Sequence, residues 1–299
     1  MIKTLVSIEV DLASSLAIRF ACQLGGLIPM EVHPVYVKEF PSDGSLIGAG
    51  WASRTREREI IREGKGEISE MITAEMDFCP ELNEPRVIYG DREAELLKIM
   101  KMEDFGLYVE GSHFSWNASA IYKQLHSKLY KNLAFPVVWV RALRKVNQVL
   151  ILCLNPTATE TLAQVFQKIW RDCPVPLLLG LPSENGRGEV LREAVEKARS
   201  LLEQSGCKVA VQDNLPSNHE GLTDESLNFP LVAMALERDV KKDQPSLHWL
   251  AMIKTSSLVA FYLGHVEECG ETNARNQERD LHQLSDESSV MDWGAAAAQ

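Results

Sequence analysis

The sequence lacks the long apolar segments that would place it in a membrane. No stretch offers the roughly 18 consecutive apolar residues that a membrane span needs. Residues 1–6 resemble the start of a strand, and they show neither the basic start nor the apolar middle of a cleavable signal peptide. We therefore expect a cytoplasmic protein that does not bind membranes.

Paired cysteine motifs are also absent. The 299 residues contain six cysteines, none of them in a Cys-x-x-Cys pair, and several of them lie inside apolar runs. Buried free thiols are common in such surroundings. This pattern predicts free thiols in a reducing compartment for the six cysteines Cys22, Cys79, Cys153, Cys173, Cys207 and Cys269.

Compact catalytic and metal-binding motifs are missing as well. The seven histidines show no HxxxH, HExxH or Cys/His spacing, and no GxSxG nucleophile motif occurs. Carboxylate pairs such as Glu57/Glu59 and Glu267/Glu268 occur only in polar segments, where the pKa shifts that acid–base catalysis needs are not expected. The sequence therefore predicts no enzyme activity and no metal site.

Positive charge is scarce in the chain as a whole. The net charge of −11 and the pI near 5.2 argue against nucleic-acid binding, which needs a basic surface. Residues 111–159 are the exception, because they contain no acidic residue and six cations. These cations predict either an anion-docking surface or, as we favour, a solvated helix face and linker: Lys123, Lys128, Lys131, Arg141, Arg144 and Lys145.

What the sequence does contain is an alternation of short aliphatic runs with longer segments of helical spacing. Such alternation is typical of βαβ units around a parallel sheet. In the first half we expect strands at residues 4–10, 31–37, 85–90, 105–111 and 135–141, and helices at 13–24, 51–78, 92–102 and 116–133.

The second half repeats this order. We expect strands at residues 148–154, 175–181, 208–213, 229–236 and 256–263, and helices at 157–171, 187–204 and 244–255. The first two strands of the second half begin 144 residues after their counterparts in the first half, whereas the later strands begin about 120 residues after theirs. A duplication followed by a deletion explains both spacings. We expect residues 41–50 to be the extra loop of the first copy, and residues 215–227 to be irregular.

The pattern predicts two domains and a tail. Residues 1–143 form the first expected domain, residues 147–264 the second, and a short basic link holds them side by side. Residues 265–299 are acidic and carry little apolar periodicity. We expect this tail to be disordered.

Four segments of the first half together resemble the universal stress protein family. They are residues 4–11 (TLVSIEVD), 87–91 (VIYGD), 104–112 (DFGLYVEGS) and 135–140 (FPVVWV). The resemblance extends over residues 2–264. It implies an α/β fold of two tandem Rossmann-like, doubly wound parallel sheets similar to the adenine nucleotide alpha hydrolases. Each sheet would have the strand order 3-2-1-4-5, and the two would pair as an intramolecular pseudo-dimer.

The family's ATP-binding members carry an acidic residue after strand one and a Gly-x-x-Gly, nine residues, Gly-Ser/Thr motif after strand four. Here Glu9 and Gly111 match, but Phe114 replaces the second glycine and no Gly-Ser or Gly-Thr pair occurs at or near Lys123-Gln124. The second copy has Leu154 and Leu236 in place of the acid and the first glycine. The remnant nucleotide site that the resemblance implies consists of Glu9, Val37, Gly111, Ser112 and His113.

These substitutions predict that no ATP is held in the usual way, because backbone amides must approach the phosphates closely. Our leading hypothesis is a stress-response binding or regulatory protein with an unidentified protein partner, no required cofactor and room for further homodimerisation. The alternative is a protein that binds ATP, AMP or another anion in the first copy. A nucleotide hydrolase is the third hypothesis.

Four aromatic residues lie near the ligand edge expected for the first copy. Two interpretations are open, namely that they anchor a partner or that they fill the space of the missing nucleotide. The four are Trp51, Phe114, Trp116 and Tyr122.

Overall fold

The computed structural model describes residues 1–39, 51–76, 79, 82–183, 188–216, 224 and 228–263, with the side chains of residues 51–54 and 76 left out. Residues 1–263 form one compact unit. The loop at residues 41–50, most of the connection at 215–227 and the acidic tail from residue 265 lie outside the described residues. The expectations for these three segments stay predictions.

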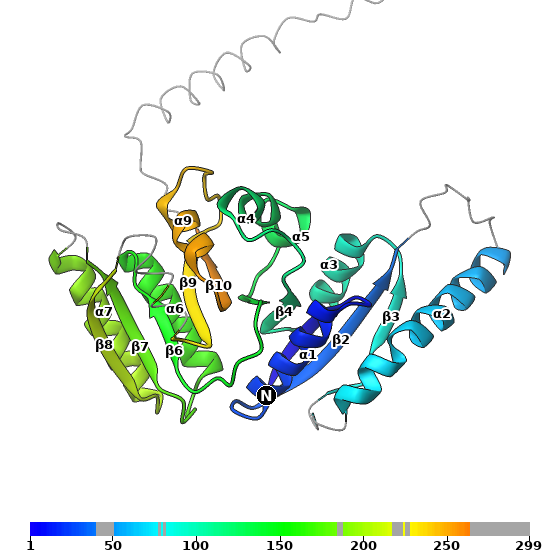
Figure 1. The fold of residues 1–299 in the computed structure, drawn as a ribbon, viewed down its shortest axis with the longest axis horizontal. Coiled ribbons are helices and arrows are strands. Elements are labelled where there is room, and N and C mark those ends of the chain that lie inside the picture. The colour runs from blue at the N-terminus through cyan, green and yellow to red at the C-terminus, as the bar shows by residue number, and fades with distance from the viewer. Residues whose placement is uncertain are drawn as a thin grey trace, which may run out of the picture. The chain divides into compact units, whose positions relative to one another are not determined.

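The first half of the chain contains the five expected strands (Figure 1). The helix expected at residues 116–133 is two short helices, because a turn at His126 ends the first and Ser127 caps the second. In chain order the elements are β1 (Ile2–Ile8), α1 (Leu12–Gly25), β2 (Met30–Lys38), α2 (Trp51–Met76), β3 (Arg86–Tyr89), α3 (Arg92–Met102), β4 (Leu107–Gly111), α4 (Ala118–Leu125), α5 (Lys128–Lys131) and β5 (Val137–Val140).

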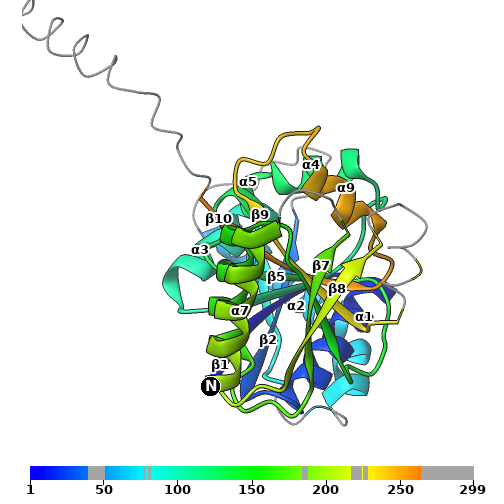
Figure 2. The same ribbon diagram turned by 90° about the vertical axis from the view of Figure 1, so that its left-hand side faces the viewer.

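The second half also contains its five expected strands. Each of its three expected helices begins within one residue of the expected start. Its elements are β6 (Val149–Leu152), α6 (Pro156–Ile169), β7 (Leu177–Pro182), α7 (Gly188–Gln204), β8 (Val209–Leu215), β9 (Leu231–Glu237), α9 (Pro245–Met252) and β10 (Ser256–Tyr262). Figure 2 views the molecule from the side of α7 and β8.

All ten strands belong to one sheet, in the order β3-β2-β1-β4-β5-β10-β9-β6-β7-β8. When the strands are numbered within each half, both halves have the expected order 3-2-1-4-5. The order is counted from opposite edges of the sheet, so that the fifth strands of the two halves meet in the middle. Neighbours are parallel except β5 and β10, which pair antiparallel with Trp139 opposite Ser257. The α/β fold is confirmed, with one detail changed, because the two expected sheets are joined into one continuous sheet. The domain boundary near residues 143–147 stays a prediction.

Helices cover both faces of this sheet, as a mostly parallel sheet requires. Side chains of α1, α2, α6 and α7 pack on one face, and those of α3, α4, α5 and α9 pack on the other. Alternate residues of each strand therefore enter different cores. Within the described residues, no helix has the length and apolar content needed to cross a membrane.

The prediction of six free cysteines is wrong for two of them. Cys22 of α1 and Cys79 form a disulfide, with their Cα atoms 5.4 Å apart. Their sequence separation of 57 residues concealed this pairing, because spacing alone does not reveal which segments the fold brings together. Cys153, Cys173 and Cys207 are free and buried, as expected, and Cys269 lies outside the described residues.

Candidate functional site at the carboxyl edge of the first half

The candidate site lies where β1 and β4 end side by side. The two strands are parallel, and Ser7 of β1 lies opposite Glu110 of β4. The next strand, β2, pairs with β1 on its other side. Chain connections leave β1 and β4 in opposite directions along the sheet, and this switch point is where doubly wound folds place their ligands. Glu9 and Gly111 therefore reach the same edge, as expected.

Two hydrogen bonds, both made by Ser14, fix the turn from β1 into α1. The Asp11 carboxylate accepts from the backbone N–H of Ser14 at 2.8 Å, and the Ser14 hydroxyl accepts from the N–H of Glu9 at 2.7 Å. A side-chain acceptor at this N-cap position satisfies an amide that the helix itself leaves free. The turn thus holds the Glu9 and Asp11 carboxylates in place at the sheet edge.

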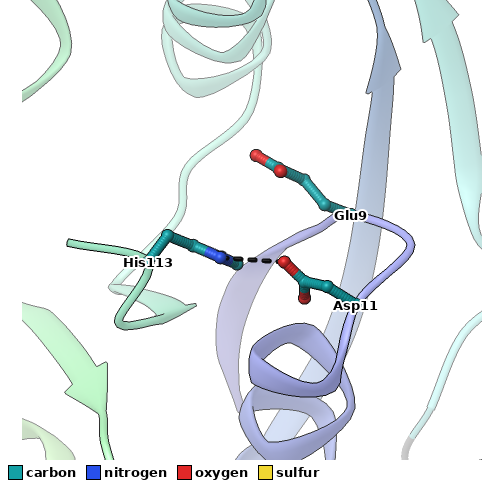
Figure 3. Close-up of side chains that lie close together, drawn as sticks. All are labelled: Glu9, Asp11 and His113. Carbon is teal, nitrogen blue, oxygen red and sulfur yellow. Dashed lines mark ion pairs between the residues drawn. The ribbon is translucent and has the colours of Figure 1, made fainter.

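His113 completes a cluster with these two carboxylates. It lies on the loop after β4, and its Nδ1 atom is 2.9 Å from the Asp11 Oδ2 atom (Figure 3). Glu9, Asp11 and His113 each offer a ligand atom within 4.8 Å of the others. Carboxylate and imidazole ligands suit several divalent cations. These side chains could therefore hold one, although the sequence predicted no metal site.

Arg92 connects this exposed cluster to the buried part of the sheet. It is the first residue of α3, whose N-cap is Asp91. Its guanidinium lies 3.3 Å from the carboxylates of both Glu9 and Glu110, and it donates to the Ser7 hydroxyl at 2.9 Å. Arg92 therefore bridges the ends of β1 and β4.

Glu110 is a buried carboxylate, 2% exposed, and each of its oxygens has donors. Oε2 accepts from Tyr108 at 2.7 Å, and Oε1 accepts from the Trp139 indole at 2.9 Å and from the Tyr130 hydroxyl. Tyr108 and Trp139 point to the same face of the sheet as Glu110. Tyr108 is two residues before Glu110 on β4, and Trp139 is the residue of β5 that pairs with Glu110. This dense set of donors makes the buried charge tolerable.

The electrostatics of the edge follow from this arrangement. Burial lowers the pKa of the Arg92 guanidinium, but Tyr108, Glu110 and Glu9 raise it by more, so the pKa is raised overall. Burial and then the Glu110 carboxylate raise the pKa of Tyr108 well above its usual value. Three carboxylates, those of Glu9, Asp11 and Glu110, thus share one permanent cation, and the edge keeps an excess of negative charge.

Gly111 and Ser112 are present at the edge, but their backbone has other uses. A Cβ atom on Gly111 would lie 2.3 Å from the backbone oxygen of Ala13, so the glycine lets β4 pass close to α1. The N–H of Ser112 donates to the Val140 carbonyl at 3.0 Å. An anion would have to displace this hydrogen bond to reach the amide.

Aromatic rings occupy the space beyond Ser112. Phe114 stacks on Trp116 at 5.6 Å between ring centroids, and both rings meet Trp139 edge-on. Trp116 also donates to the carbonyl of Leu250 at 3.0 Å, and the Arg141 guanidinium lies 4.4 Å from its ring centroid. These rings therefore fill the edge and join the two halves.

The remaining sequence-predicted residues are less closely involved. Val37 is buried at the end of β2, on the core face that contains Leu96 and Leu97. The Tyr122 ring packs against His126 in a tilted arrangement, and the Trp51 side chain lies outside the described residues. Among the six cations of residues 111–159, all but Arg141 are exposed, namely Lys123, Lys128, Lys131, Arg144 and Lys145.

The equivalent edge of the second half carries no such charged cluster within the described residues. Asn155 caps α6 as Asp11 caps α1, which aligns Glu9 with Cys153 instead of Leu154. Cys153 and Leu154 are both buried. A pocket of about 200 Å³ lies here, and its polar lining includes Asn155, Glu237, Gln244 and Tyr262.

Sequence reasoning missed Arg92, Glu110, Tyr130 and Trp139 as parts of one network. The available signal was the glutamate inside the run Leu107–Gly111, which the fold buries completely. A carboxylate in a strand buried on both faces needs partners, and these had to come from other elements. Without the strand order, the sequence did not identify them.

Comparison with known proteins agrees with this architecture. The structure resembles a universal stress protein from Archaeoglobus fulgidus (TM-score 0.55, 14% identity, 89% of this chain and 97% of that chain covered). It also resembles a Pseudomonas aeruginosa protein of unknown function (TM-score 0.51, 13% identity, 96% and 97% covered). No family model and no curated protein matches the sequence. The expected universal-stress-protein-like fold is therefore confirmed, and at these identities the likeness is one of fold.

Proposed function

We propose that this protein is a binding or regulatory module of the stress response that works without a conventional ATP site. The observation that carries the proposal is the use of the β4 end by the protein itself. Ala13 takes the close approach that Gly111 allows, Val140 takes the amide of Ser112, and Phe114 packs on Trp139. Backbone groups that would cradle a phosphate are thus already engaged.

The electrostatics support the same conclusion. Glu9, Asp11 and Glu110 outnumber the single guanidinium of Arg92, so a triphosphate approaching this edge meets net negative charge. Like charges at such distances repel by an amount that grows as water is excluded. We infer a cytoplasmic protein whose biological partner is another protein.

Isothermal titration with ATP and AMP, without a divalent cation, tests this proposal. We expect no heat of binding, and we expect no nucleotide in the mass spectrum of freshly purified, denatured protein. Stoichiometric nucleotide, or titratable binding that Arg92 and Glu9 variants alter, would contradict it.

One observation favours a second candidate function, the binding of a nucleotide or another anion through a metal. The cluster of Glu9, Asp11 and His113 has ligand atoms spaced within 4.8 Å, and a divalent cation held there would attract the phosphates that the bare cluster repels. Repeating the titration with Mg²⁺ or Mn²⁺ separates the candidates. Binding that needs the cation and is lost in His113→Ala and Glu9→Gln supports the second one, and turnover of the nucleotide would indicate a hydrolase.

A further inference from the structure

A second feature lies at the other end of α1, away from the candidate site. The disulfide between Cys22 and Cys79 lines a pocket of about 490 Å³. Its other lining residues are Arg19, Gln23, Glu75 and Leu143. The pocket therefore places a reactive sulfur–sulfur bond beside polar side chains.

The two cysteine residues differ in exposure. Cys79 is 2% exposed, whereas Cys22 is only partly buried. Thiol–disulfide exchange needs a thiolate to reach one sulfur, and access decides which one is attacked. Cys22 is the sulfur that a thiol entering the pocket would meet.

The polar lining offers two recognition groups. Gln23, which is partly exposed, carries a buried Oε1 atom that receives no hydrogen bond from any described residue, so a ligand N–H group would satisfy it once the amide turns toward the pocket. Arg19 binds the buried Glu75 carboxylate through Nε at 2.7 Å, and its side chain is 51% exposed. Its outer nitrogens suit a ligand carboxylate.

We propose that this pocket is a thiol-exchange site for a low-molecular-weight thiol that carries an N–H group and a carboxylate. The thiol enters as its thiolate, the carboxylate meets Arg19, and an N–H group donates to Gln23. The proposal concerns a site distinct from the sheet edge and does not depend on the proposed function.

The exchange balances as follows. The ligand thiolate attacks Cys22 Sγ, and a new sulfur–sulfur bond forms as the bond between Cys22 and Cys79 breaks. The bonding pair leaves with Cys79 Sγ, which takes up a proton from water. A second ligand thiolate can then attack the mixed disulfide, which releases Cys22 as a thiol and the ligand as its oxidised dimer. The two ligand thiols are oxidised and the protein disulfide is reduced.

Breaking the bond would remove the covalent link between α1 and the residue that follows α2. Residue 79 follows α2, and the described contacts of α2 with α1 otherwise include the Glu75 pair with Arg19 and Ser15. The covalent link therefore adds to the restraint that these contacts and the buried Ile72 place on this end of α2. Modification of Cys22 couples the thiol state of the surroundings to the attachment of α2.

Glutathione is the probe for the first experiment. Full-length protein in a Cys269→Ser background is incubated with reduced glutathione, quenched with acid and mapped by peptide mass spectrometry. We expect one glutathione on Cys22, and none on Cys153, Cys173 or Cys207, which serve as internal controls because they are buried. A disulfide that stays intact, or glutathione spread over the buried cysteines, would overturn the proposal.

A second experiment tests recognition and uses 2-mercaptoethanol, which lacks both the N–H group and the carboxylate. The measured quantity is the ratio of exchange rates with glutathione and with 2-mercaptoethanol, because this ratio cancels any change in pocket opening or stability. Loss of one charge-assisted hydrogen bond predicts an about tenfold lower ratio in Arg19→Gln, and Gln23→Leu is expected to lower it as well. An unchanged ratio in both variants would overturn the assigned ligand class.

Discussion

The carboxyl-terminal edges of the two halves have the same backbone arrangement but differ in charge. At the first edge, Asp11 caps α1 and faces His113, and Arg92 links Glu9 to Glu110. At the second, Asn155 caps α6 and bonds the Tyr262 hydroxyl at 3.2 Å. The first edge is filled by ion pairs and aromatic rings, and the second keeps a pocket of about 200 Å³. One topology can thus support two unrelated surfaces, so the fold alone does not specify a ligand.

The largest effect is expected from removing the cation of the first edge. Arg92→Met leaves the buried Glu110 carboxylate without its countercharge, and breaking a buried pair in this way costs about 3–5 kcal/mol of unfolding free energy. Urea unfolding measures the change. The double variant Arg92→Met/Glu110→Gln should recover part of the loss, and a loss below about 1 kcal/mol in the single variant would contradict the role of Arg92.

The close approach of β4 to α1 predicts the next largest effect. Gly111→Ala would place a Cβ atom 2.3 Å from the Ala13 backbone, and overpacking of this kind costs about 1–3 kcal/mol. Gly180→Ala in β7 is the matched control, because its nearest atoms are side-chain ends of Leu215 and Leu150 that can move. Thermal unfolding should show the larger loss at Gly111, and equal losses would contradict the argument.

The two helix caps provide a closer comparison of the edges. Asp11→Ala and Asn155→Ala each remove an acceptor 2.8 Å from a backbone N–H, and each should cost about 1 kcal/mol. Asp11→Asn keeps an acceptor at the cap but loses the charge that faces His113. Urea unfolding of the three variants should therefore rank Asp11→Asn as the mildest change at the first edge. An Asp11→Asn variant as unstable as Asp11→Ala would show that the His113 contact, and not the cap, dominates.

The smallest effect concerns acid stability. The Arg86 hydrogen bond holds the pKa of Glu103 below its usual value. A carboxylate with a lowered folded-state pKa stabilises the protein above its unfolded pKa, and this contribution is lost as the pH falls through the folded-state value. Because the pair is partly exposed, the contribution is about 0.5 kcal/mol.

The unfolding free energy of Glu103→Gln, measured between neutral pH and pH 3, should therefore lie below that of the wild type at neutral pH, and this gap should close in acid. The fully exposed Glu193, whose pKa the Lys197 hydrogen bond lowers, is the comparison in the second half, and Glu193→Gln should show a smaller difference from the wild type that closes in acid in the same direction. A gap at Glu103 that widens in acid would reverse the assigned sign.

Much of the fold could be predicted from the sequence because local signals agree with the final packing. Helix α3 begins and ends where expected, since Asp91 caps it and the apolar residues Leu96, Ile99 and Met100 recur with helical spacing. The strands were found because a parallel sheet buries both of its faces, which leaves continuous aliphatic runs. Local chemistry and burial point to the same elements.

The candidate site was only partly predictable. Glu9, Gly111, Ser112 and His113 meet at one edge because each follows a strand that ends there. Contacts such as Arg92 with Glu110 depend on side chains from elements that the sequence does not order in space. The disulfide between Cys22 and Cys79 escaped prediction for the same reason.

The antiparallel pairing of β5 with β10 has a consequence for how the two edges can change over time. Two identical chains joined in this way would carry every substitution twice, once at each edge. Here a single gene product supplies both partners, so a mutation alters one edge and leaves the other as it was. The charged network around Glu110 and the uncharged cap at Asn155 can therefore change independently of each other.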